Sequence, residues 1–134
     1  MYQFKLVNDI EEYINDEVED SIYYCELSKI APTNLSKDLL LEFSNDEKSH
    51  AENFKQAYYY MTGRMFVTKL IEPPKISEYK EALKIRMLAE TKDYKKYGEQ
   101  YLLAPNKYLK DLFFMTRTVE AQHAMRIPIL FEEK

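Results

Sequence analysis

Both histidines of this sequence lie in the same four-residue motif. His50 follows Glu47 by three positions, and His123 follows Glu120 by three positions. Residues three apart share one face of an α-helix, so each carboxylate and imidazole can reach the same metal ion. Carboxylate and imidazole ligands without thiolate favour iron or manganese, and fit zinc less distinctively. The two motifs therefore indicate metal chemistry.

Each motif also has a partner glutamate at the same distance. Glu17 precedes Glu47 by 30 residues, and Glu90 precedes Glu120 by 30 residues, an interval that returns an antiparallel helix to the same level. A histidine on an apolar face is more often a core residue than a ligand, but four glutamates on such faces change this interpretation, because buried carboxylates without a counter-charge are very costly. No lysine or arginine is expected on these faces, whereas two divalent ions would supply four positive charges. The predicted ligands are Glu17, Glu47, His50, Glu90, Glu120 and His123.

Helix-breaking residues divide the chain into four segments that can position these ligands. Ala31-Pro32, Gly63 with Pro73-Pro74, and Ala104-Pro105 interrupt long stretches rich in helix-forming residues. We expect helices over 3–31, 35–62, 77–104 and 106–131. With only two glycines, a fold of many tight β-turns is disfavoured. The prediction is one all-α domain over 1–134, a four-helix bundle of two helical hairpins joined by a crossover linker.

Apolar residues spaced three and four apart define the face that each helix should bury. For the third helix the expected face comprises Leu83, Met87, Glu90, Tyr94, Tyr97 and Tyr101. The same pattern in the other helices places the remaining predicted ligands on buried faces.

The two halves of the chain repeat one another at an offset of 73 residues. This shift places Glu17 on Glu90 and Tyr24 on Tyr97, and it superposes the two Ala-Pro pairs and the two Glu-x-x-His motifs. Two amphipathic hairpins share some matches at any offset, but here every predicted ligand matches at one offset. We interpret the halves as duplicated hairpins with approximate two-fold symmetry.

These residues resemble those of the ferritin-like superfamily, and within it the rubrerythrin group. The resemblance rests on Glu17 with Tyr24 seven residues later, on the run Asp46-Glu47-Lys48-Ser49-His50-Ala51-Glu52, and on the second set of Glu90 and Glu120-x-x-His123. It implies a ferritin-like fold and a di-iron site in which Glu47 and Glu120 bridge the ions. It also implies reduction of peroxide or dioxygen. Ferroxidase or iron-storage activity, and a partner-binding bundle with a structural metal site, are the alternatives.

Two departures from the rubrerythrin pattern affect this interpretation. The chain has one cysteine, Cys25, and so none of the paired CxxC motifs of a rubredoxin domain. Electrons would have to come from an external donor such as a rubredoxin-like protein. Where rubrerythrins carry an extra glutamate, this chain has Asp93. That residue could be a further ligand, a hydrogen-bond acceptor for a ligand histidine, or a solvated surface group.

The tyrosines nearest the predicted ligands have two interpretations. Tyr24 and Tyr97 could hydrogen-bond the ligands or donate electrons during oxidation, or they could simply pack in the core with their hydroxyl groups satisfied.

Composition limits the partners of the protein. A net charge of -4 and a pI of about 5.3 give no electrostatic basis for binding nucleic acid or an anionic membrane. No apolar run is long enough to span a membrane, and the N-terminus does not resemble a signal peptide, so we expect a cytoplasmic protein. The linker over 63–76 can just span a helix of about 28 residues. Because this linker is tight and apolar, we expect a homodimer, with exchange of hairpins between chains as an alternative arrangement.

Overall fold

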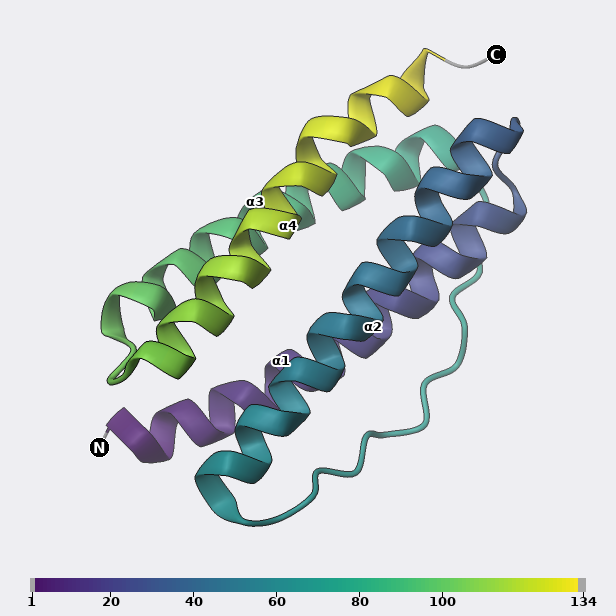
Figure 1. The fold of residues 1–134 in the computed structure, drawn as a ribbon. Helices are drawn as coiled ribbons and strands as arrows, with labels where there is room; N and C mark the ends of the chain where they lie inside the picture. The colour runs from purple at the N-terminus through teal and green to yellow at the C-terminus, as the bar shows by residue number, and fades with distance from the viewer. Residues whose placement is uncertain (1, 133–134) are drawn as a thin grey trace. The chain divides into compact units, whose positions relative to one another are not determined.

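The computed structural model describes residues 2–132 and consists of four long helices (Figure 1). They are α1 (Tyr2–Lys29), α2 (Asn34–Thr62), α3 (Tyr79–Leu103) and α4 (Lys107–Phe131). The predicted fold class, an all-α four-helix bundle of the ferritin-like type, is confirmed. Each predicted helix boundary lies within about two residues of the observed one, the usual uncertainty of helix ends.

Helices α1 and α2 form the first hairpin and run in opposite directions (Figure 1). Aromatic rings and hydroxyl groups set their register. Tyr24 packs edge-on against Phe43 at 5.4 Å between ring centroids, and the Ser44 hydroxyl donates a hydrogen bond of 2.7 Å to the Ser21 carbonyl oxygen. Further along, the Tyr58 hydroxyl donates to Glu11. These contacts hold the two helices at a fixed level relative to one another.

The second hairpin has the same plan. Tyr97 of α3 stacks on Phe113 of α4 with 6.3 Å between ring centroids, and the Arg117 guanidinium lies 4.0 Å from the centroid of the Tyr94 ring. Both hairpins therefore position their facing residues through aromatic contacts between antiparallel helices.

The N-terminal caps of α2 and α4 occupy matching positions of the 73-residue repeat. Thr33 and Ser36 exchange backbone-to-side-chain hydrogen bonds of 3.1 Å, an arrangement similar to a capping box. At the equivalent position, the Asn106 side chain accepts a hydrogen bond of 2.9 Å from the backbone N–H of Leu109. The repeat thus extends to the residues that start the second helix of each hairpin.

The segment between Gly63 and Glu78 has no regular secondary structure. Gly63 follows the end of α2 with a φ of 73°, a conformation that glycine adopts readily. Three apolar side chains of the linker are exposed, those of Met65, Val67 and Leu70, and Leu70 is fully exposed. None of the helices within the described residues is long and apolar enough to cross a membrane.

The predicted buried face of α3 was partly wrong. Tyr94 is exposed, and Met87 and Tyr101 are only half-buried, whereas Arg86 and Gln100 are buried. The buried face is therefore displaced around the helix toward polar residues. The predicted ligands on the other three helices are all buried, as expected: Glu17, Glu47, His50, Glu120 and His123.

Candidate metal centre

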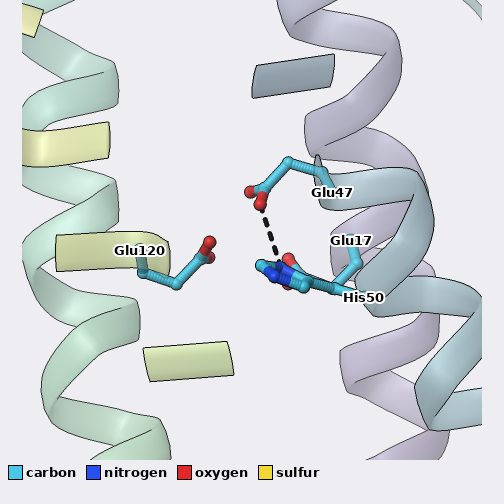
Figure 2. A group of neighbouring side chains, drawn as sticks. All are labelled: Glu17, Glu47, His50 and Glu120. Carbon is cyan, nitrogen blue, oxygen red and sulfur yellow. Dashed lines mark hydrogen bonds and ion pairs between the residues drawn. The ribbon is translucent and has the colours of Figure 1, made fainter. Parts of the chain in front are cut away.

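The first hairpin brings one glutamate of α1 together with the Glu-x-x-His motif of α2. One side-chain donor atom from each of Glu17, Glu47 and His50 lies within 4.8 Å of the others. His50 Nδ1 is 2.9 Å from a Glu17 carboxylate oxygen and 3.1 Å from a Glu47 carboxylate oxygen. Figure 2 shows the side chains of Glu17, Glu47 and His50 pointing toward one another. We call Glu17, Glu47 and His50 the first half-site.

Burial strongly perturbs the acid–base properties of the first half-site. Removal from water raises the pKa of Glu17 well above its ordinary value, and the neighbouring Glu47 carboxylate adds to this effect. Burial alone would lower the pKa of His50, but hydrogen bonds and charge interactions with Glu17 and Glu47 raise it to about 10. The imidazolium therefore balances part of the carboxylate charge when no metal is bound.

The second hairpin repeats this arrangement with Glu90 of α3 and with Glu120 and His123 of α4. Donor atoms of these three residues lie within 4.8 Å of one another, and all three side chains are fully buried. His123 Nδ1 is 2.8 Å from Glu90 Oε2 but 3.8 Å from the nearest Glu120 oxygen. We call these residues the second half-site. The structure thus brings the three predicted ligands of each hairpin close together, and their role as metal ligands stays a prediction.

An arginine that the sequence analysis did not anticipate contacts the second half-site. Arg86 lies one helical turn before Glu90, is only 6% exposed, and donates a hydrogen bond of 3.0 Å from Nη2 to Glu90 Oε1. The expectation that no arginine or lysine would lie on these faces was wrong. The spacing of four residues between Arg86 and Glu90 could have signalled this ion pair.

The other predicted site residues lie near the half-sites in sequence but differ in their surroundings. Asp93 is half-buried and forms an ion pair of 3.2 Å with Lys96, so part of its charge is balanced on its own helix. Tyr24 and Tyr97 are fully buried, and their rings pack on phenylalanines of the facing helices. Core packing accounts for the position of both rings, and their roles in chemistry remain predictions.

The donor set of each half-site fits a divalent cation. Two carboxylates and one imidazole converge in a buried environment, and oxygen and nitrogen donors of this kind suit iron and manganese. In the first half-site, Glu17 Oε2 is buried and accepts no hydrogen bond from the described residues. A buried carboxylate oxygen in this state is costly unless a cation binds it.

Four long helices that carry two sets of a glutamate and a Glu-x-x-His motif define the class of ferritin-like carboxylate bundles. Within that class, the rubrerythrin family model matches residues 10–127. The chain therefore belongs to the rubrerythrin family. Comparison with curated proteins gives no match, and comparison with solved structures gives none either.

Proposed function

We propose that this protein is a di-iron oxidoreductase that reduces peroxide, or dioxygen, with electrons from an external donor. The observation that carries the proposal is the pair of buried half-sites in a chain of the rubrerythrin family. Together they offer four carboxylates and two imidazoles, the ligand set of di-iron bundles. Two bound ferrous ions would supply the two electrons that, with two protons, convert one molecule of hydrogen peroxide into two of water.

In this proposal the residues of each half-site have distinct roles. Glu17 and His50 would hold the first ion, Glu90 and His123 would hold the second, and Glu47 and Glu120 would serve both ions. Because His50 has a pKa of about 10 in the metal-free hairpin, metal binding must displace its proton. The same Nδ1 atom that faces the two carboxylates then becomes available as a ligand.

The experiment that tests this function separates turnover from iron uptake. Protein loaded anaerobically with ferrous iron is mixed with one equivalent of hydrogen peroxide per pair of ions, and iron oxidation is followed by absorbance. A rubredoxin-like protein and its reductase are then supplied with further peroxide. We expect continued peroxide consumption at constant iron content.

Different outcomes would point to other functions. Progressive uptake of many iron ions per chain, with no donor-dependent peroxide consumption, would identify iron as a substrate and the protein as a ferroxidase. Bound metal that reacts with neither oxidant would indicate a structural site. The double variant Glu47→Ala and Glu120→Ala should lose the peroxide reaction. The matched control is Glu52→Gln, which removes an exposed carboxylate from the same helix as Glu47 and should retain the reaction.

A further inference from the structure

The duplication of the two half-sites breaks down one helical turn before Glu90. The offset of 73 residues relates every predicted ligand of one hairpin to a ligand of the other, but it relates Arg86 to Tyr13. The Tyr13 ring packs against Phe54 with 5.6 Å between ring centroids, whereas Arg86 donates a hydrogen bond to Glu90. One half-site therefore has an aromatic contact at the position where the other has a permanent positive charge.

Because of this difference, the equivalent carboxylates Glu90 and Glu17 have different hydrogen-bond partners. In the second half-site, Glu90 Oε1 accepts from Arg86 at 3.0 Å and Glu90 Oε2 lies 2.8 Å from His123 Nδ1, so both oxygens are engaged. In the first half-site, Glu17 Oε1 lies 2.9 Å from His50 Nδ1, and Oε2 accepts no hydrogen bond from the described residues. A cation can approach Glu17 Oε2 without displacing a protein group.

We propose that the two half-sites are inequivalent, and that Arg86 makes the second half-site the weaker one, which fills after the first. This inference rests on the proposed di-metal function, and it assigns Arg86 as a positioning residue that acts through Glu90. The guanidinium holds Glu90 Oε1 and leaves only Oε2 for a metal ion.

The physical basis is a difference in what metal binding must displace. In the first half-site, Glu17 Oε2 accepts no hydrogen bond from the described residues, so a metal ion that binds this oxygen breaks no hydrogen bond. The guanidinium of Arg86 cannot lose its proton in a protein, so its charge remains when a dication arrives. Binding at the second half-site therefore brings two like-charged groups together beside one buried carboxylate. The distance from His123 Nδ1 to the Glu120 carboxylate is 3.8 Å, whereas the equivalent distance from His50 Nδ1 to Glu47 is 3.1 Å. The donor atoms of the second half-site therefore lie farther apart at this position.

Stepwise metal titration of the full chain tests the proposal. Ferrous iron is added anaerobically to metal-free protein, and binding is followed by calorimetry. We expect two steps per chain whose dissociation constants differ by about tenfold or more, the range over which groups that contact metal ligands change affinity. The variant His50→Gln should lose the tighter step, and His123→Gln should lose the weaker one.

Variants of Arg86 then test the cause of the difference. Arg86→Gln should tighten the weaker step by about tenfold or more and leave the tighter step unchanged. Arg86→Lys keeps the charge and should keep the weaker step weak. Arg117→Gln is the matched control, because it removes one arginine of the same hairpin that lies over the Tyr94 ring. It should alter neither step.

Each result has a defined meaning. Two steps of equal affinity in the wild type, a tighter step that disappears in His123→Gln, or an unchanged weaker step in folded Arg86→Gln would overturn the inference and leave the di-metal function intact. Uptake of fewer than two ions by the wild type would instead overturn the proposed function itself. If Arg86→Gln does not fold, as judged by circular dichroism, the comparison of His50→Gln with His123→Gln still decides the order of filling.

Discussion

In the metal-free protein, His50 should remain protonated throughout the neutral pH range. Burial opposes this, but the Glu17 and Glu47 oxygens at 2.9 and 3.1 Å from Nδ1 raise its pKa from 6.5 to about 10. Each pKa unit corresponds to about 1.4 kcal/mol. The difference between the folded and unfolded values is therefore equivalent to about 5 kcal/mol of stability, which is an upper limit for this one group.

The sign of the pH dependence follows from the direction of the shift. A pKa that is higher in the folded state stabilises the protein fully below pH 6.5, and this contribution is lost as the pH rises toward about 10. The pKa of Glu17 is also raised, first by burial and then by Glu47, and a raised pKa of a carboxyl group gives a pH dependence of the same sign. The free energy of unfolding of the metal-free protein should therefore fall as the pH rises.

Two measurements in the presence of a chelator test this reasoning. Urea unfolding between pH 6.5 and about 10 should show a loss of several kcal/mol. NMR titration of the two imidazoles, assigned with a His123→Gln variant, should give His50 a pKa near 10, and Glu17→Gln should lower it. Glu52→Gln removes an exposed carboxylate from α2 and should have no effect. A His50 that titrates near 6.5 in the wild type would refute the argument.

Three further predictions concern the site, a helix cap and assembly. Replacing both predicted bridging residues, Glu47→Ala and Glu120→Ala, should abolish iron binding as measured by elemental analysis. The metal-free variant should keep its helical circular dichroism, because removing buried carboxylates also removes charge repulsion. Retained binding of two ions would be inconsistent with the bridging roles. Asn106→Ala should lower the free energy of unfolding by about 1 kcal/mol in urea, because the cap of α4 is lost, whereas Asn53→Ala on the exposed face of α2 should not destabilise the protein. The exposed apolar linker favours association, so light scattering should report a homodimer, and a single 16.1 kDa species at micromolar concentration would contradict this.

The helices, and the grouping of two glutamates and a histidine in each hairpin, could be predicted from the sequence because strong local signals specify both. Proline and glycine mark the ends of the helices, and a spacing of three residues places a glutamate and a histidine on one helical face whatever the rest of the fold does. The interval of 30 residues between Glu17 and Glu47 likewise depends only on helix rise and turn length. Residue spacing, helix rise and turn length do not depend on which side chains pack against one another in the folded protein.

The buried face of α3 could not be predicted in the same way. Two sets of positions along this helix have the same three-and-four spacing. One contains Met87, Tyr94 and Tyr101, and the other contains Arg86 and Gln100. Hydropathy favours the apolar set, but the structure buries Arg86 and Gln100. The ion pair with the Glu90 carboxylate stabilises the buried guanidinium of Arg86, and this interaction outweighs the preference for apolar side chains at buried positions.

The central claim, that the two half-sites hold two metal ions, is tested most directly by metal analysis. Metal-free protein is reconstituted anaerobically with ferrous iron, freed of unbound iron and analysed for iron and protein. The account predicts about two ions per chain, and loss of about one ion in each of the single variants His50→Ala and His123→Ala. A wild-type chain that retains no iron, or that retains the same amount after both histidines are replaced, would contradict it.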